Sequence, residues 1–324
     1  MGDQVKYQRT RKYGLDFLKG IAACFVVFMH VKYPGLFGDY VASVGTFAVP
    51  VFFMTSGYFS HNATRAKTLK SLKRTLTYLL VAYLLNLVRI MIGYGFDLGE
   101  ISCFFRTEVF TINHLIRFIL LSQSKISGVA WFLISLLTCY ALKYLIGKNL
   151  RYLGYVGLIV GVVGVLPPIS GYVGLPINNA WINGIPFFII GDLLNEYKVM
   201  ADERISNVLL TFSSLLGFVL IVVACYYGTE WWHIGTLLLS PSLFVLFGRM
   251  DMKYNAMCLL GSVYAFFIYI VHPLVMHVYD AVRPSPSITE SWLRPLIVLT
   301  VTILLAVVYY SIKRMVLKAK EEKR

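Results

Sequence analysis

Long apolar runs alternate with short polar segments along the whole chain. From residue 15 onward, stretches dominated by Leu, Ile, Val, Phe and Ala recur until shortly before the C-terminal end. A helix needs about 20 such residues to cross the hydrocarbon core of a bilayer. The pattern therefore predicts an all-α fold, a polytopic membrane bundle of about ten transmembrane helices. We place them at residues 15–31, 41–60, 75–95, 127–146, 152–170, 180–197, 206–227, 231–248, 256–280 and 293–316.

One further apolar stretch is too short to be a span. Residues 109–123, VFTINHLIRFILLSQ, are amphipathic, which is typical of a helix that lies at the membrane interface or enters the membrane and returns. No repeat of fixed period and no long polar segment interrupts the pattern. We therefore expect a single transmembrane domain, residues 1–324, with short basic tails at 1–13 and 317–324.

The positive charge of the chain lies mostly between the apolar runs. Hydrophobic residues make up 58% of the chain and charged residues only 14%, and the net charge is +14. Such a charge can indicate a nucleic-acid-binding protein, but here Lys and Arg gather in connecting segments, as in loops that set membrane topology. With a cytoplasmic N-terminus, 22 of the 30 Lys and Arg residues fall in cytoplasmic segments and 7 on the other side, and Lys19 lies inside the first helix. This distribution predicts that both termini are cytoplasmic, and it favours membrane lipid over nucleic acid as a partner.

The five cysteines give no sign of a metal site or of a disulfide framework. Cys24, Cys103, Cys139, Cys225 and Cys258 lie mostly inside apolar runs, and none takes part in a CxxC or Cys/His spacing. The sequence therefore predicts no metal.

The first apolar run, DFLKGIAACFVVFMH, carries three ionisable side chains. Asp16 can pair with Lys19 at a spacing of three residues. Lys19 and His30 are about three helical turns apart, so they share a face and lie roughly 16 Å apart along the axis. Such groups are costly toward lipid, so this face should line a protein interior or a wet cavity. His30 could then act as a general base for a hydroxyl, or as a nucleophile that accepts an acyl group. Its alternative is a histidine hydrogen-bonded at the membrane interface.

Further segments follow this helix in a fixed order. They are AVPVFFMTSGYF from Ala48, WFLISLL from Trp131, IPFFIIGDLL from Ile185 and LLGSVYAFFIYIVHPLVMH from Leu259. Together with the first helix, this set resembles the acyltransferase 3 family of integral-membrane O-acyltransferases that act on carbohydrates. The resemblance covers essentially the whole chain.

The resemblance implies an enzyme that moves an acyl group from cytoplasmic acyl-CoA to a hydroxyl of a glycan or glycolipid. In that family the first helix carries a basic residue, ten intervening residues and a histidine, which fall here on Lys19 and His30. The histidine matching His30 is taken as catalytic, and Lys19 with Asp16 would form a polar pair on the donor side. Acetyl-CoA or another acyl-CoA would be the donor substrate, and the enzyme would need no bound cofactor. The resemblance also implies that the protein lies in a bacterial plasma membrane.

The family also has an arginine-rich motif at the cytoplasmic start of the third helix, and the chain departs from it. The matching segment, LKSLKRTLTY, offers Lys70, Lys73 and Arg74. CoA is strongly anionic at its nucleotide end, so these three residues are candidates for binding the acyl-CoA phosphates. Lysine neutralises phosphate but lacks the bidentate fork of arginine.

Five more residues are candidates for lining the cavity, and each also has a structural reading. Ser56, together with Gly57 in the TSGY segment, suits a close helix contact, Arg89 a buried counter-charge, and Trp131 an anchor at the membrane interface. Tyr269 and His272 lie three residues apart on one helix face, where they could line a cavity or fix helix packing.

Polar residues also occur near the ends of the fifth and sixth predicted spans. For Asp192 and Glu196, near a predicted cytoplasmic end, ordinary salt bridging is favoured. The segment from Pro167 to Gly184 contains asparagines and aromatic residues that could meet a sugar or form simple turns.

Two other classes of protein fit the apolar pattern. A transporter or flippase for a small polar or acylated metabolite would also need about ten spans with polar groups inside the membrane. It would move its substrate across a membrane without consuming a thioester. A sensor or partner subunit would bind a ligand at such a pocket without turnover.

Overall fold

The computed structural model describes residues 12–164, 178–229 and 232–321. All regular structure in these ranges is helical. Most of the predicted basic tail 1–13, part of the tail 317–324 and the end of the predicted span 152–170 lie outside the described residues. So does most of the polar segment Pro167–Gly184.

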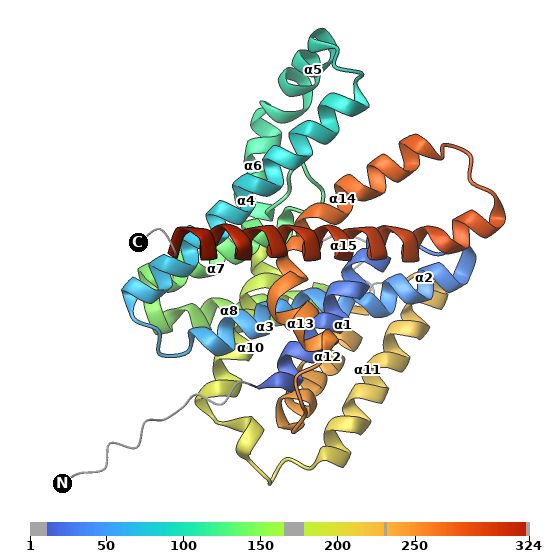
Figure 1. Cartoon of the computed structure of the whole chain (residues 1–324). Coiled ribbons are helices and arrows are strands. Elements are labelled where there is room, and N and C mark those ends of the chain that lie inside the picture. The colour runs from blue at the N-terminus through green and yellow to red at the C-terminus, as the bar shows by residue number, and fades with distance from the viewer. Residues whose placement is uncertain (1–11, 165–177, 230–231, 322–324) are drawn as a thin grey trace.

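The helices follow one another with short connections (Figure 1). The longer ones are α1 (Tyr13–His30), α2 (Gly35–Val44), α3 (Ala48–Ser60), α4 (Arg65–Gly93), α6 (Ile112–Leu121), α7 (Trp131–Ile146), α8 (Leu150–Gly164), α10 (Ile185–Glu196), α11 (Asn207–Tyr227), α12 (Trp232–Arg249), α14 (Ala265–Val282) and α15 (Ile288–Glu321). Short helical segments are η1 (Gly45–Phe47), α5 (Leu98–Phe104), η2 (Phe105–Val109), η3 (Gly147–Asn149), η4 (Ala180–Gly184), η5 (Val199–Ala201), α13 (Ala256–Leu259) and η6 (Leu260–Tyr264).

Each predicted span overlaps a helix in the described part of the chain, but fewer stretches meet the requirements for crossing a membrane. By length and hydropathy, 7 helical stretches qualify among the described residues. One of them, Trp131–Gly164, is a hairpin, because Gly147 at φ +58° ends α7 before α8 begins. The chain is therefore an all-helical membrane protein with several spans, and the number ten stays a prediction.

The basic segment before the third predicted span is helical rather than a loop. α4 begins at Arg65, ten residues before the predicted start of the span at 75. The Thr64 side chain caps it by accepting a hydrogen bond from the Lys67 backbone N–H at 3.3 Å. Arg, Lys and Leu are strong helix formers, so the capped basic segment continues directly into the apolar run.

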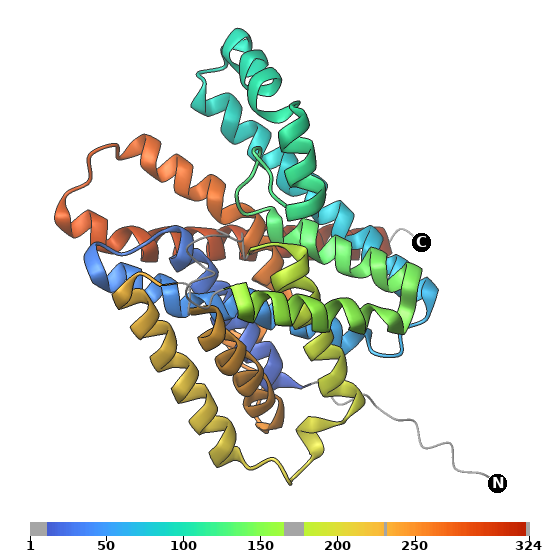
Figure 2. The same ribbon diagram turned by 180° about the vertical axis from the view of Figure 1, so that it is seen from behind.

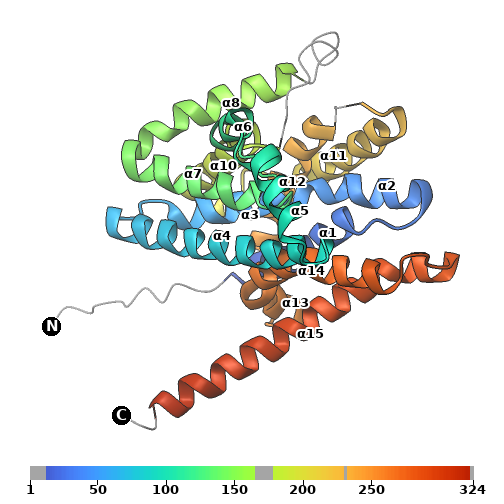
Figure 3. The same cartoon turned by 90° about the horizontal axis from the view of Figure 1, so that it is seen from above.

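Several turns lie on two opposite sides of the bundle. Figure 3 shows the turns at 61–64 and 147–149 and the C-terminal end of α15 on one side. The turns at 31–34 and 283–287 lie on the other. The first side, which we call the basic side, carries the Lys- and Arg-rich starts and ends of α4, α7, α8 and α15. That grouping is the arrangement expected of a cytoplasmic face.

Close helix contacts at glycine hold the centre together. A Cβ on Gly57 of α3 would lie 1.8 Å from the Phe188 carbonyl oxygen of α10, and one on Gly191 would lie 2.0 Å from that of Met54. The two glycines let the backbones of α3 and α10 approach to within contact, as small residues do in membrane helices. The predicted role of the TSGY segment in close helix approach is thus confirmed for Gly57.

A helical lobe extends from the bundle on the side away from α11 and α12 (Figures 1 and 2). It consists of α5, η2 and α6 at the end of α4, and the segment 122–130 returns from it to α7. Residues 112–121, inside the predicted amphipathic stretch 109–123, form the described helix α6. Its apolar face is exposed and includes Ile112, Leu115 and Ile119.

Candidate active site

His30 is the last residue of α1, and it is exposed. The helix closes with the Val31 N–H donating to the Val27 carbonyl at 2.8 Å, and the chain then turns through residues 31–34 into α2. Pro34 in this turn cannot donate the backbone hydrogen bond that a continuing helix would need. Because α1 ends at this residue, the His30 imidazole lies at the end of the helix, where it is exposed.

The ring of His272, from α14, stacks on the ring of His30. Their centroids are 5.3 Å apart and their planes differ by 29°. His272 is fully buried, and its Nδ1 lies 3.0 Å from the Ile268 carbonyl oxygen, which can only accept. Nδ1 therefore carries the proton, and Nε2 has no hydrogen-bond partner in the described structure. The buried, fixed ring supports one face of His30.

His30 opens onto a cavity of about 860 Å³, which we call the lobe cavity. Its other walls come from α6, η2, the segment 122–130 and the start of α7, and they are mostly polar. The lining side chains include Thr107, Glu108, Asn113, His114, Arg117, Gln123, Lys125, Trp131 and Asn178. A polar cavity with one aromatic wall beside a histidine is suited to a ligand rich in hydroxyl groups.

Three side chains hold the lobe wall in place. His114 is buried, its Nδ1 lies 2.7 Å from the Val109 carbonyl oxygen, and its Nε2 accepts the Lys125 backbone N–H at 3.1 Å. The Lys125 ammonium bonds the Glu108 carboxylate at 2.8 Å. This hydrogen bond lowers the pKa of the Glu108 carboxyl from its ordinary value. Both ring nitrogens of His114 thus have partners, and this residue supports the wall.

Lys19 lines a second cavity, which we call the bundle cavity. Its volume is about 310 Å³, and it lies between α1, α3, α4, α7 and α14. The Lys19 ammonium pairs with Asp16 at 2.7 Å, as the spacing predicts. Arg74 and Lys67 of α4 and Ser56 of α3 share the lining. Cationic and hydroxyl groups thus meet at the end of the bundle nearer the basic side.

Aromatic rings separate the bundle cavity from the lobe cavity. Phe52 lines the bundle cavity and lies 6.1 Å from Phe132. The centroid of the Phe132 ring lies 4.8 Å from that of Phe53 and 5.2 Å from that of Tyr269. Phe53 in turn lies 6.3 Å from Trp131, which lines the lobe cavity. Lys19 and His30, expected on one channel, line two cavities on either side of this aromatic layer.

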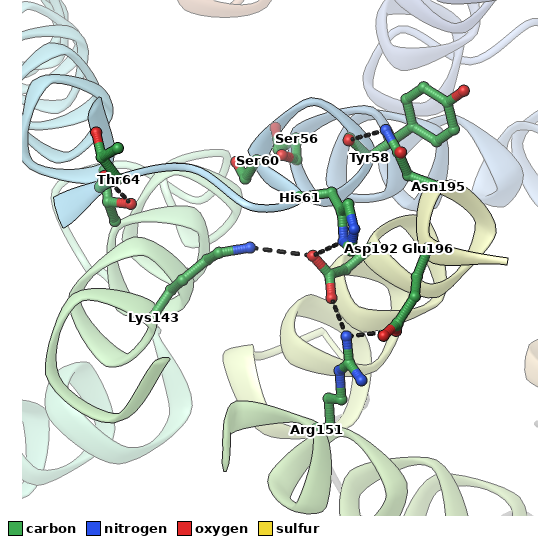
Figure 4. Close-up of polar contacts among 11 residues, drawn as sticks. Ser56, Tyr58, Ser60, His61, Thr64, Lys143, Arg151, Asp192, Asn195 and Glu196 are labelled. Carbon is green, nitrogen blue, oxygen red and sulfur yellow. Dashed lines mark hydrogen bonds and ion pairs between the residues drawn. The ribbon is translucent and has the colours of Figure 1, made fainter. Parts of the chain in front are cut away.

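A third cavity, the turn cavity, lies on the basic side between the turns at 61–64 and 147–149. Its volume is about 490 Å³. At its base the buried Asp192 carboxylate accepts hydrogen bonds from Lys143 at 3.1 Å and Arg151 at 3.2 Å, and the His61 ring nitrogen lies 3.3 Å from it (Figure 4). Arg151 also pairs with Glu196 at 2.5 Å. The predicted salt bridging of Asp192 and Glu196 is confirmed.

The structure brings some of the predicted site residues to these cavities and leaves others elsewhere. The residues that line a cavity are His30 and Trp131 at the lobe cavity and Lys19, Ser56 and Arg74 at the bundle cavity. The residues outside the linings of these three cavities are Asp16, Lys70, Lys73, Arg89, Tyr269 and His272.

Three of the residues outside the linings have definite structural partners. Arg89 donates to the Asn86 side chain at 3.1 Å and to the Ile126 carbonyl at 3.2 Å, so it ties α4 to the segment that returns from the lobe. The Tyr269 hydroxyl donates to the Val129 carbonyl of the same segment. His272 supports His30 from behind.

Sequence reasoning missed the turn cavity and the contribution of the lobe. The turn cavity joins Arg65, Lys143, Lys148 and Arg151, which appear in the sequence only as scattered loop charges. The lobe residues come from a segment whose amphipathic pattern suggested lipid contact alone. The one signal that could have pointed to it is the cluster of polar residues His114, Arg117 and Gln123 on that segment.

A comparison with protein families shows where this arrangement belongs. Residues 12–311 match the acyltransferase 3 family, described as an acyltransferase domain. Comparisons with curated proteins and with solved structures give no significant match. The matched range includes all three cavities and both stacked histidines. The chain therefore belongs to the acyltransferase 3 family, and it is a membrane acyltransferase.

Proposed function

We propose that the protein transfers an acyl group, most simply acetyl, from acyl-CoA to a hydroxyl group of a carbohydrate or lipid-linked glycan. The observation that carries this proposal is His30: an exposed imidazole, supported by His272, at the wall of a polar cavity of about 860 Å³. Within the described residues no group hydrogen-bonds the His30 ring. Its basic nitrogen is thus available to a ligand in the lobe cavity.

The chemistry needs only a base and a thioester. The acceptor hydroxyl oxygen attacks the thioester carbonyl carbon while His30 takes the hydroxyl proton. The new C–O ester bond forms, the C–S bond breaks, and the electron pair leaves with sulfur. The imidazolium then returns the proton to the CoA thiolate, so the histidine ends as it began. A two-step route, in which His30 first accepts the acyl group, uses the same residues.

The acceptor site fits the lobe cavity. Sugars are bound by side chains that donate and accept hydrogen bonds and by aromatic rings that cover their apolar faces. Asn113, Gln123 and Glu108 supply the first kind and Trp131 the second. His30 in the lining of this cavity directly precedes the turn at 31–34, which lies on the side of the bundle opposite the basic side (Figure 3). We therefore propose an acceptor on the outer face of a bacterial plasma membrane.

The donor approaches from the basic side. Lys19 and Arg74 in the bundle cavity offer positive charge on the path, and the exposed Lys70 and Lys73 of α4 add to the field that attracts anionic CoA. The acyl end of the uncharged pantetheine arm must then pass the layer of Phe52 and Phe132 to reach His30. A shift of these rings when the donor binds would bring the two substrates together and exclude water.

Release of free CoA from acetyl-CoA by the purified, reconstituted protein tests the proposal. A crude bacterial glycolipid extract serves as acceptor, and the acylated product is followed by mass spectrometry. We expect acceptor-stimulated CoA release with a matching acylated product. Labelled substrate that crosses liposomes with the thioester intact would instead support transport. Folded protein that releases no CoA with any acceptor or acyl chain would overturn the proposal.

A further inference from the structure

The turn cavity contains more positive charge than its own acidic residue can balance. Arg65, Lys143, Lys148 and Arg151 line it, and Asp192 is the only carboxylate among the described residues of its lining. Lys143 and Arg151 are engaged by Asp192, and Arg151 also by Glu196. A cavity with this excess of cationic side chains on the basic side attracts anions.

Two of these cations have no acidic partner among the residues that the structure describes. Arg65 lies over the ring of Tyr144, 5.6 Å from its centroid, and Lys148 lies in the turn between α7 and α8. Both are exposed and both line the cavity. A nucleobase can also bind here, because a flat base stacks on a planar guanidinium or on an aromatic ring.

The turn cavity adjoins the bundle cavity. Ala63 and Thr68 belong to the linings of both, so one wall, formed by the turn at 61–64 and the first turn of α4, separates them. An anion held in the turn cavity could therefore extend a thin chain into the bundle cavity beside Lys19.

We propose that the turn cavity binds the 3′-phospho-ADP end of the acyl-CoA donor, with Arg65 and Lys148 as its direct phosphate contacts. Asp192 positions Lys143 and Arg151 at the base of the cavity, so that the cationic wall keeps its shape when no donor is bound. This inference rests on the proposed acyl-CoA-dependent function. It moves the nucleotide site from Lys70, Lys73 and Arg74 to the far side of the turn at 61–64.

The binding test uses the full-length protein in nanodiscs of phosphatidylcholine, with adenosine 3′,5′-bisphosphate as the probe and calorimetry as the readout. We expect wild type to bind the probe, and Arg65→Gln and Lys148→Gln each to weaken binding about tenfold, because each removes a charge-assisted hydrogen bond. Lys320→Gln is the matched control. It removes an exposed positive charge on the basic side, at the far end of α15, and should bind like wild type.

The kinetic test separates this inference from the proposed function. With acetyl-CoA, Arg65→Gln and Lys148→Gln should raise KM about tenfold and leave kcat unchanged. With S-acetylpantetheine, which lacks all the phosphates, the variants should match wild type. Wild-type turnover with acetyl-CoA and unchanged KM in both variants would overturn the nucleotide site while the enzyme function stands. If wild type turned over neither donor, the function would fail, and probe binding would still decide the site.

An anionic lipid headgroup has similar phosphate chemistry, and a second arm distinguishes it. Thermal stability is measured in phosphatidylcholine nanodiscs with and without phosphatidylglycerol. A nucleotide site predicts that the probe stabilises wild type in both membranes, and that Arg65→Gln and Lys148→Gln lose this effect. Stabilisation by phosphatidylglycerol that both variants lose, without any response to the probe, would assign the cavity to lipid and overturn the proposal.

Discussion

The imidazole of His272 stacks on that of His30, with the ring centroids 5.3 Å apart, although the residues lie on helices from opposite ends of the chain. His272 is buried and fixed by its bond to the Ile268 carbonyl, whereas His30 is exposed to the lobe cavity. One ring is thus structural and the other is available to a substrate. This division of roles leads to the first two predictions.

Replacing His30 by Ala should remove acyl transfer while the protein stays folded. A positioned general base contributes roughly 10²- to 10⁴-fold to a rate, so kcat should fall by at least about 100-fold. The measurement is acceptor-stimulated CoA release, and unchanged thermal unfolding of the variant is its control. Equal rates for variant and wild type would remove His30 from the mechanism.

Replacing His272 should affect the reaction through the position of His30. We expect His272→Ala to lower kcat about tenfold with little change in KM for either substrate, because the His30 ring loses its support. His272→Phe keeps a ring for stacking and should recover most of the rate. If Phe were as poor as Ala, the imidazole of His272 would itself take part in the chemistry.

The close contact of α3 with α10 should not tolerate a methyl group. Gly57→Ala would place a carbon 1.8 Å from the Phe188 carbonyl oxygen, so the two helices must move apart, at a cost of about 2 kcal/mol or more. Thermal unfolding in detergent should show the loss. Gly93→Ala in α4 is the control, since its nearest neighbours are His277 ring atoms at 3.9 Å, and it should be neutral.

Asp192 should be important for stability because it balances buried charge. Its side chain is 8% exposed, and those of Lys143 and Arg151 are 14% and 20% exposed. Asp192→Asn leaves these cations short of a counter-charge, which should cost about 3 kcal/mol. Asp39→Asn is the control, because its pair with Lys32 is half exposed and should contribute little. Similar melting temperatures for both variants would contradict this role.

The pair of Glu108 with Lys125 should give the lobe a small dependence on pH. The hydrogen bond from Lys125 lowers the pKa of Glu108 below its ordinary value of 4.5, so the pair stabilises the folded state above that pH. The contribution is lost as pH falls through the lowered pKa. The difference in melting temperature between wild type and Glu108→Gln should therefore be constant near neutral pH, shrink below pH 4.5 and vanish below the lowered pKa. A difference that persists in acid would assign Glu108 another role.

The pattern of apolar residues was enough to predict the helices, and the spacing of charged residues was enough to predict ion pairs near them. The Asp16–Lys19 ion pair and the salt bridges of Asp192 and Glu196 follow from spacing and neighbouring charge, and the structure contains both. The predicted span at 75–95 overlaps α4, which begins ten residues earlier, at Arg65. An apolar run marks the part of a helix that could lie in lipid, whereas Thr64 and the helix-forming basic residues begin the helix a further ten residues earlier.

The sequence by itself thus determined the helical membrane class, the approximate positions of the helices and the family, because bilayer thickness, helical periodicity and motif spacing are local properties of the chain. It also indicated His30 as a candidate base, which stays a prediction. Only the tertiary structure decided that His272 supports His30, that aromatic rings separate Lys19 from His30, and that four basic residues line one cavity together with Asp192. These relations depend on how each helix is rotated and how closely its neighbours approach. Contacts such as those of Gly57 and Gly191 set both. Such contacts join residues far apart in the chain, which no local pattern records.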